Sequence, residues 1–454
     1  MKHSPSKEVL QDKELGGKVG KIFGSEFLST LGVFTGFTKR AGLLDAQSFV
    51  GSCLGMVREE GWGGSLSDHC AQLSSTYDIG IQPQSLDERF NESSETMMRY
   101  LFDQVMGVDL RQNNPMRLLE LFEEVYIQDS TNMELPAMLK TLYKGSGGGA
   151  SEAGLKIDAL YGLRWGSMQL RFHDSAGSDH WQGVPEMKQG ALLLRDLGYF
   201  KLGDFRTIHQ KGVWFLSRSK FNVKVYLDAQ GQNELDWGVY LKQMRENESQ
   251  SLKVYLGKED LLEVRLVVQK VPQAVADYKR HKLKTDKQNK RKGLSKARLD
   301  WCAVNAYITN IPEQMISNEQ IMCLYGLRWI IEILFKAWKS IAGLKDKINR
   351  MKPHRFMCLL YAHMIKVLID SKIVLFFKIE FWNLFGFKIS ELKAFAVLKA
   401  FKTKWWQALT LGQPENIELV LEQIAMTILK LAQKRKYNKK EHHCDFYIFL
   451  NKFT

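Results

Sequence analysis

The chain has 454 residues, of which 45% are hydrophobic, and its 64 Lys and Arg outnumber its 50 Asp and Glu to give a net charge of +14. At about 150 residues per domain, the length predicts two to four domains, and the hydrophobic share is enough for a normal buried core. The positive charge favours a polyanionic partner, nucleic acid first, although a merely basic soluble protein has the same balance.

The sequence argues against three other classes of protein. The six cysteines are scattered without a C-x-x-C pair or a zinc-site spacing, which suits a reducing cytoplasm. The first residues, MKHSPSKEVLQDKE, contain no apolar stretch of the kind found in secretory signals. The most apolar region, 356–387, is interrupted by charged side chains, so it predicts a buried helix and no membrane association.

Residues 1–115 are predicted to form a small helical domain. Segments such as LLDAQSFVGSCLGMVREE and SETMMRYLFDQVM have apolar residues at helical spacing.

Residues 116–220 are predicted to form the first part of an α/β core. FEEVYIQDST is a strand ending at 129–131, LKIDALY and MQLRFHD are two more strands, and a helix is expected near Asp179. Ala191–Arg195 is a buried strand that ends at Asp196, and a short helix and the strand VWFLSRS follow. This order of strands and helices predicts a mixed sheet flanked by helices.

Two carboxylates in this core, Asp129 and Asp196, each close an apolar strand. Ends of adjacent strands in one sheet can bring such residues together. Two alternatives remain open: Asp129 as an Asx turn or helix cap before Ser-Thr, and Asp196 as a strand-end turn before Gly198.

Residues 221–312 are predicted to form a β-rich insertion. It contains the run KRHKLKTDKQNKRKGLSKAR, residues 279–298, with ten Lys or Arg and one acid. The run is either a solvated charged segment or a surface that tracks DNA phosphates, and the overall charge favours the second.

Residues 313–375 are predicted to complete the core, and 376–454 to form a helical region. The motif YGLRW occurs at 161–165 and again at 325–329. On a helix, the second copy places Tyr325, Arg328, Glu332 and Lys339 within about 60° of arc, opposite an apolar back. The first copy lacks this pattern and is predicted to be structural. An exposed Arg–Glu pair is the plainer interpretation of the second copy.

A single helical carboxylate becomes chemically useful beside a divalent metal. Two Mg²⁺ ions can activate the attacking group and stabilise the leaving oxygen in phosphodiester cleavage. Mg²⁺ sites commonly use only a few carboxylates, with substrate phosphate completing the coordination. Asp129 and Asp196 are the matching candidates in this chain.

The spacing Y-x2-R-x3-E-x6-K resembles the signature of the DDE transposases of bacterial insertion sequences, in the insertion-sequence-four family. The segments IQDST, LLLRDLGYF and ITNIP also resemble family blocks and occur in the family order. The resemblance is good over about 120–345, loose in the N-terminal domain and weak beyond about 380.

The resemblance implies an RNase H-like fold with a β-rich insertion before the Glu-bearing helix. It implies that Asp129, Asp196 and Glu332 hold Mg²⁺, with Mn²⁺ as a substitute, and that the N-terminal domain binds DNA. Three residues would contact the transposon-end phosphates beside the cleaved bond: Tyr325, Arg328 and Lys339. The position of Arg218 matches a basic position of the family after the fifth strand, which implies that it also binds DNA.

Two further residues, Asp158 and Trp301, resemble functional residues of the family but lie at positions that do not match its pattern. Asp158 also lies in a strand, but it follows the Gly-rich loop, whereas the first family carboxylate precedes it. Some relatives stack a flipped base on a tryptophan of the insertion, but the position of Trp301 relative to ITNIP does not match, which favours strand packing for this residue.

By resemblance, the chain is expected to be a cut-and-paste DNA transposase in the bacterial cytoplasm, associated with the nucleoid. It would bind double-stranded transposon ends and target DNA as a homodimer, with the C-terminal helices as a contact surface, and form a hairpin on the transposon end. The alternatives are an RNase H-like nuclease or resolvase that cuts without joining, and a non-enzymatic DNA-binding protein such as a decayed transposase.

Overall fold

The structure, a computed structural model, describes residues 14–58, 61–62, 64–108, 117–146, 151–176, 183–286, 294–344, 348, 350–410 and 414–434. The chain divides into two compact units. Unit 1 comprises Met1–Pro115, Ser130–Ser178 and Ile331–Lys439, and unit 2 comprises Met116–Asp129, Asp179–Ile330 and Lys440–Thr454.

The described N-terminal part of unit 1 is helical, with one two-stranded ribbon. The helices are α2 (Glu14–Phe23), α3 (Ser25–Phe34), α4 (Ala46–Met56), α5 (Leu66–Tyr77), α6 (Pro83–Arg89) and α7 (Glu92–Met106), and the ribbon pairs β1 (Val57–Arg58) with β2 (Gly61–Trp62). Helix α7 begins with a capping box between Asn91 and Ser94, and its buried stripe includes Met98, Leu101 and Val105.

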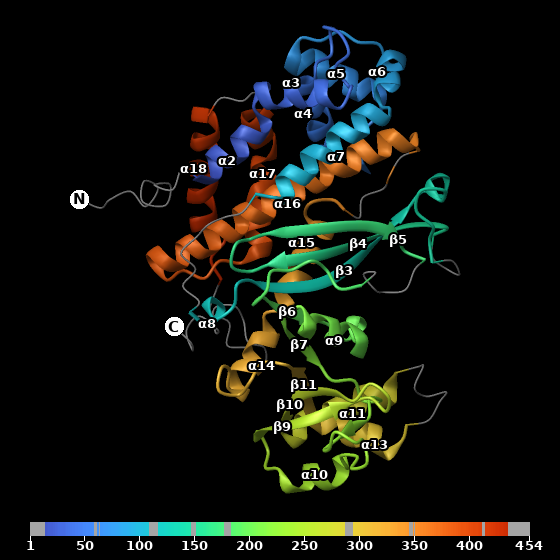
Figure 1. Ribbon diagram of the computed structural model, residues 1–454. Coiled ribbons are helices and arrows are strands. Elements are labelled where there is room, and N and C mark those ends of the chain that lie inside the picture. Colours follow the sequence, from blue (N-terminus) through green and yellow to red (C-terminus); the bar gives the residue numbers. More distant parts are fainter. Residues whose placement is uncertain are drawn as a thin grey trace, which may run out of the picture. The chain divides into compact units, whose positions relative to one another are not determined.

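The C-terminal part of unit 1 consists of α15 (Trp329–Ser340, within the unit from Ile331), α16 (Pro353–Phe385), α17 (Glu391–Thr410) and α18 (Pro414–Leu431). Helix α16 starts with a proline in its first turn and ends at Gly386, whose positive φ of 64° suits a glycine cap. It packs along α7 and α4, while α17 packs on α18 (Figure 1). Nearly every side chain of α16 is buried, which confirms the buried helix expected at 356–387. Across the described part of the chain, no helix has the length and apolar character needed to span a membrane.

Nine strands form a mixed sheet of order β5-β4-β3-β6-β7-β11-β10-β9-β8. Strand β3 (Val125–Leu135) contributes its first five residues to unit 2 and the remainder to unit 1, where β4 (Ala153–Gly162) and β5 (Met168–Asp174) form an antiparallel hairpin. In unit 2, β3, β6 (Leu192–Arg195) and β7 (Trp214–Arg218) are parallel, and α9 (Leu202–Gln210) connects the last two. The mixed α/β fold class predicted from the sequence is confirmed.

The rest of unit 2 continues the sheet. Strand β11 (Val304–Thr309) pairs antiparallel with β7, and β10 (Leu262–Lys270), β9 (Ser249–Leu256) and β8 (Val225–Tyr226) follow outward. The other helices described in unit 2 are α8 (Arg117–Glu120), α10 (Trp237–Gln243), α11 (Gln273–Thr285), α13 (Lys296–Asp300) and α14 (Asn318–Gly326). Short 3₁₀ turns occur at Ala137–Leu139, Leu197–Tyr199 and Trp301–Ala303.

The predicted end of the first core strand was wrong. The first strand does not end at 129–131 but runs on to Leu135, because its second half alternates buried and exposed side chains as a strand with one covered face does. The helix expected to start near Asp179 falls on residues 177–182, which lie outside the described part of the chain, and the described residues 183–190 are irregular.

Candidate active site

Two neighbouring parallel strands place Asp129 and Asp196 side by side. Strands β3 and β6 are paired in register, with Gln128 opposite Arg195, and the residue after each of these two is an aspartate. Neighbouring strands lie about 4.8 Å apart, which brings the two carboxylates to adjacent positions. Both side chains remain accessible, with 19% of Asp129 and 40% of Asp196 exposed. The structure therefore places the two candidate carboxylates directly after the paired segments of two strands.

The strand-end turn considered for Asp196 is also present. One of its carboxylate oxygens accepts a hydrogen bond from the Gly198 amide at 3.4 Å, and the residue caps the 3₁₀ turn Leu197–Tyr199. The second oxygen is the one that faces Arg328. The turn therefore orients the carboxylate and leaves one oxygen directed toward the site.

A buried hydrogen-bond network includes the residues that precede the two aspartates, and it was not predicted from the sequence. Arg195 is fully buried; its Nε donates to Gln128 Oε1 at 2.8 Å and its Nη1 to Asp204 Oδ2 at 2.9 Å. Burial lowers the pKa of the guanidinium, and Asp204 partly offsets this. The network ties β3, β6 and α9 together one residue before each aspartate. A charged residue inside the apolar run LLLR was the signal that could have revealed it.

Arg328 is the cation between the two carboxylates. Its Nη1 lies 3.7 Å from Asp129 Oδ2, and its Nε lies 3.7 Å from Asp196 Oδ1. The side chain is only 9% exposed, so the attraction is weakly screened by solvent. Without a metal, this guanidinium offsets the repulsion between the aspartates. From its sequence pattern Arg328 was expected to bind DNA phosphate or to pair with Glu332, so its contact with the two aspartates was not predicted.

The side chain of Tyr325 is buried and lies beside Arg328. The guanidinium lies 5.8 Å from the centre of its ring, and the ring of Tyr307 lies 5.2 Å away. Burial raises the pKa of Tyr325 to about 12, with opposing effects from the charges of Arg328 and Asp196. The phenol is therefore protonated at neutral pH. Its buried hydroxyl has no hydrogen-bond partner within the described residues, so it has a proton to donate to a ligand.

Arg218 belongs to the same neighbourhood. It is the last residue of β7, opposite Tyr307 of β11, and its charge also acts on Tyr325. Its Nη2 donates to Asn305 Oδ1 at 3.3 Å, which holds the side chain at the strand end. The predicted DNA-binding residues Arg218, Tyr325 and Arg328 thus share one region of unit 2.

The prediction that the second YGLRW motif lies on a single amphipathic helix was wrong. The chain forms α14 up to Gly326 and α15 from Trp329, with a turn at Leu327 and Arg328. The amides of Leu327, Arg328 and Ile330 each bond to the carbonyl three residues earlier, which tightens the backbone there. Tyr325 and Arg328 are consequently buried and do not lie on an exposed polar stripe.

Glu332 and Lys339 lie on α15, within unit 1. Both side chains are partly exposed, and the apolar back predicted for this helix is buried: Ile331, Leu334, Ala337 and Trp338. The indole of Trp338 donates to Ser371 Oγ of α16 at 3.1 Å, which fixes the rotation of α15 about its axis. The two polar residues are thereby held on the opposite side of the helix.

The donor set suits a hard divalent cation. Asp129 and Asp196 offer carboxylate oxygens at adjacent positions, the ligand type that Mg²⁺ prefers. Within the described residues, no group of three or more His, Cys, Asp or Glu is gathered closely enough to hold a metal. The pair therefore fits a metal whose remaining ligands come from elsewhere, including substrate phosphate.

Asp158 occupies a different environment from the two aspartates above. It lies on β4, is 1% exposed, and its carboxylate is 2.6 Å from His173 Nε2 on the paired strand β5. A carboxylate enclosed in this way stabilises the hairpin. Its burial agrees with the preference for Asp129 as the first metal ligand.

The first YGLRW copy forms the turn between β4 and β5. Tyr161 and Gly162 end β4, and the Gly162 amide bonds to Ser167 O across the turn at 2.8 Å. Gly166 has φ of 63°, a conformation that favours glycine, and its carbonyl accepts a bond from Lys372 at 3.2 Å. Arg164 lies over the Trp165 ring at 5.0 Å. These contacts favour a structural role for the motif.

Replacing Arg164 with alanine is expected to lower the free energy of unfolding by roughly 0.5–1 kcal/mol, because the contact with Trp165 is lost at a partly exposed position. DNA cleavage per folded molecule should not change. Urea unfolding and a cleavage assay on one preparation measure both quantities. A stable but inactive Arg164→Ala protein would assign a functional role to the first motif.

The basic run at 279–298 is only partly a free surface. Lys279 is half-buried and donates to Asn305 Oδ1 at 2.9 Å, and Arg280 bonds to Leu299 O and Asp277. Lys282, Lys284, Lys296 and Arg298 are exposed on α11 and α13, and residues 287–293 lie outside the described part.

Trp301 packs in the 3₁₀ turn against Trp237, with ring centres 4.7 Å apart, and therefore not within a strand as expected.

Comparison with known proteins agrees with this arrangement. Residues 120–365, more than half of the chain, match the family described as Transposase DDE domain. The chain is 30% identical over 407 residues to a transposase for insertion sequence element IS1151 from Clostridium perfringens, covering 83% of this chain and 85% of that protein. It is 27% identical over 442 residues to a transposase for insertion sequence element IS231B from Bacillus thuringiensis subsp. berliner, covering 92% and 90%.

The matched range contains both strands that carry the paired aspartates and the helix that carries Glu332. The sheet order β5-β4-β3-β6-β7 is that expected of an RNase H-like core. In this order β3 and β6, the first and fourth core strands along the chain, are neighbours. The adjacent carboxylates and the family match lead to one conclusion: the chain belongs to the DDE transposases and is an enzyme of that type.

Proposed function

We propose that this enzyme moves an insertion sequence by cut-and-paste transposition. It binds the terminal inverted repeats, hydrolyses one strand at each end, and joins the freed 3′-OH to target DNA. Both reactions are in-line attacks on phosphorus, by water or by the 3′-OH, so one site can serve both. The observation that carries the proposal is the adjacency of Asp129 and Asp196 on paired parallel strands, with Arg328 between them.

The proposed metal ligands are Asp129, Asp196 and Glu332, and the proposed metal is Mg²⁺, with Mn²⁺ as a substitute. When bound, the metal neutralises charge on the phosphate and lowers the pKa of an attacking water. The two aspartates are supported by their position, and Glu332 is supported by its place on the partly exposed side of α15.

The proposed DNA contacts are Arg218, Tyr325, Arg328 and Lys339. Tyr325 is protonated and its hydroxyl can donate to a phosphate oxygen. Arg328 has a planar fork of donors that can bind a phosphate in two places while its charge also acts on the aspartates. Lys339 supplies a point charge from the partly exposed side of α15.

We further propose that the enzyme works as a homodimer on DNA, in the bacterial nucleoid. The C-terminal helical region carries large apolar side chains that are exposed: Leu384, Phe387, Leu419 and Leu431. These side chains are the proposed contacts between the two copies.

A strand-transfer assay with a pre-cut transposon end tests the function. The expected product is the labelled end joined to a target plasmid, in the presence of Mg²⁺. An RNase H-like nuclease would nick an uncut end but form no joined product, and a decayed transposase would bind the end without either reaction. Either of these results would contradict the proposal.

The salt dependence of DNA binding is expected to weaken when exposed lysines of the basic run are removed. Replacing Lys282, Lys284 and Lys296 with glutamine should flatten the slope of log affinity against log salt by about 2 to 3, since each phosphate contact contributes roughly 0.9. Fluorescence anisotropy with a labelled end duplex at several salt concentrations measures the slope.

A matched control removes the same charge from other exposed lysines of unit 2: Lys211, Lys242 and Lys258. This variant should keep a slope close to that of the parent. If both triple variants change the slope equally, the run acts only through net charge and does not contact DNA phosphates.

A further inference from the structure

Two cations of unit 2 donate hydrogen bonds to the same neutral oxygen. Arg218 ends β7, Lys279 lies on α11, and Asn305 lies on β11. Arg218 Nη2 donates to Asn305 Oδ1 at 3.3 Å, and the ammonium of Lys279 donates to the same oxygen at 2.9 Å. The fold therefore brings two positive groups together from segments that are far apart in the chain.

The amide of Asn305 fixes this arrangement. Its nitrogen donates to Gln269 Oε1 at 3.1 Å on the paired strand β10, which leaves its oxygen directed toward the two cations. An amide oxygen accepts hydrogen bonds without carrying a full negative charge. Asn305 therefore orients the two side chains but does not neutralise them.

No acidic side chain among the described residues pairs with either cation. The other acceptor that Lys279 reaches is also neutral, the carbonyl of Val304 at 3.5 Å. Burial lowers the pKa of the Lys279 ammonium, and the charge of Arg218 lowers it further, against an opposite effect of Cys302. Both cations are only partly buried, so an anion can reach them, and a bound anion would relieve their repulsion.

The pair lies in the neighbourhood of the candidate active site. The charges of Arg218 and of Asp196 both act on the phenol of Tyr325. Lys279, for its part, is the first residue of the basic run at 279–298. The pair therefore connects the surroundings of Asp196 with the start of that run, and all of these residues belong to unit 2.

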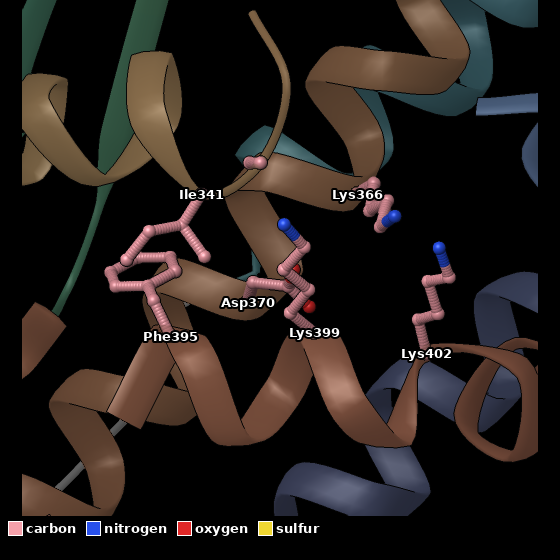
Figure 2. Close-up of a pocket in the computed structure, with 7 residues that line it drawn as sticks. Ile341, Lys366, Asp370, Phe395, Lys399 and Lys402 are labelled. Carbon is pink, nitrogen blue, oxygen red and sulfur yellow. The ribbon is translucent and has the colours of Figure 1, made fainter. Parts of the chain in front are cut away.

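A lysine cluster in unit 1 provides a contrast. Lys366, Lys399 and Lys402 line a pocket together with the carboxylate residue Asp370, as Figure 2 shows. The volume of this pocket is about 20 Å³, which is room for about one water. That pocket is too small for a phosphate, whereas Arg218 and Lys279 are open to solvent at the surface of unit 2.

We propose that Arg218 and Lys279 bind one and the same backbone phosphate of a bound DNA end, and that Asn305 positions both side chains for it. This inference rests on the proposed function and adds Lys279 and Asn305 to its DNA-binding residues. A phosphate suits the pair because its oxygens can accept from both cations at once. A guanidinium has five N–H donors and an ammonium three, so each cation can bind Asn305 and the phosphate together.

DNA ends in which single phosphates are replaced by uncharged methylphosphonates test whether the two cations share one phosphate. Fluorescence anisotropy with the full-length protein in metal-free buffer gives the affinities. At one position, the replacement should weaken binding by the parent about a hundredfold, because two charge-assisted contacts are lost. At that position the loss should be about tenfold in Arg218→Gln and in Lys279→Gln, and nearly absent in the double variant.

Lys242→Gln is the matched control, because it removes the same charge from an exposed lysine of unit 2. It should keep the loss that the parent shows at every position. If Arg218→Gln and Lys279→Gln lose sensitivity at different positions, or keep the sensitivity of the parent throughout, the two residues do not share a phosphate and the proposal fails.

Asn305→Asp tests the positioning role. The substitution keeps the size of the side chain but puts a negative charge at the shared acceptor, where it pairs with both cations. Binding of the DNA end should weaken about tenfold, and the slope of log affinity against log salt should flatten by about 1. The free energy of unfolding, measured in urea, should not fall. A stable Asn305→Asp protein with unchanged affinity and slope would show that the cluster only supports the fold.

These binding measurements do not depend on strand transfer. A parent protein that shows the shared phosphate but forms no joined product would contradict the proposed function and support the phosphate site. A parent protein that joins the ends but shows no shared phosphate would contradict the phosphate site alone.

Discussion

Glu332→Gln is expected to lower cleavage of a transposon end by about a thousandfold or more, a loss of ~4 kcal/mol of transition-state stabilisation. Glutamine keeps the size and polarity of the side chain but removes one negative charge from the proposed metal site. Binding of the end should persist or tighten, because it depends on cations elsewhere. Mg²⁺-dependent nicking of a labelled end fragment, with a gel shift on the same preparation, measures both effects.

The aspartates provide the comparison for this result. Asp129→Asn and Asp196→Asn should lose cleavage in the same way, whereas Asp158→Asn should retain it, because that carboxylate is enclosed with His173. Near-normal nicking by Glu332→Gln would remove Glu332 from the site. An inactive Asp158→Asn protein beside an active Asp129→Asn protein would move the first carboxylate to β4.

Arg195→Met is expected to lower the free energy of unfolding by about 3 kcal/mol, because it leaves Gln128 and Asp204 without a buried partner. Methionine fills much of the same space, so the effect reports the lost network more than a cavity. In the protein that remains folded, cleavage should also fall, since Gln128 and Arg195 each precede a catalytic aspartate candidate. Urea unfolding followed by circular dichroism, and cleavage per folded molecule, are the measurements.

Arg206→Met is the matched control for Arg195. Arg206 lies on the same helix α9 as Asp204, but its ion pair with Asp260 is about 40% exposed at both ends. Exposed pairs contribute about 0–1 kcal/mol, so this variant should be nearly as stable as the parent and fully active. If Arg195→Met is equally stable and active, the buried network neither stabilises unit 2 nor positions the aspartates.

The sequence by itself determined where the strands of the core lie along the chain. Each core strand is a run of apolar or alternating residues whose pattern follows from the period of the pleat, so β4, β5, β6 and β7 were predicted close to their observed bounds. The carboxylates Asp129 and Asp196 could be selected because each follows such a run. Sheet geometry allowed such strand ends to bring them together, but the pairing of β3 with β6 is seen only in the structure. The buried helix at 356–387 was equally clear from its composition.

Only the tertiary structure decided how the polar side chains are used. A helical projection assumes one continuous helix, so it cannot detect the turn at Leu327 and Arg328, and Arg328 is buried between two aspartates. The Gln128–Arg195–Asp204 network joins residues from two strands and a helix, and the bond from Lys279 to Asn305 removes one cation from the basic run. Such contacts join residues far apart in the chain, so no local pattern encodes them. A buried charge is stable only where the fold supplies its partner.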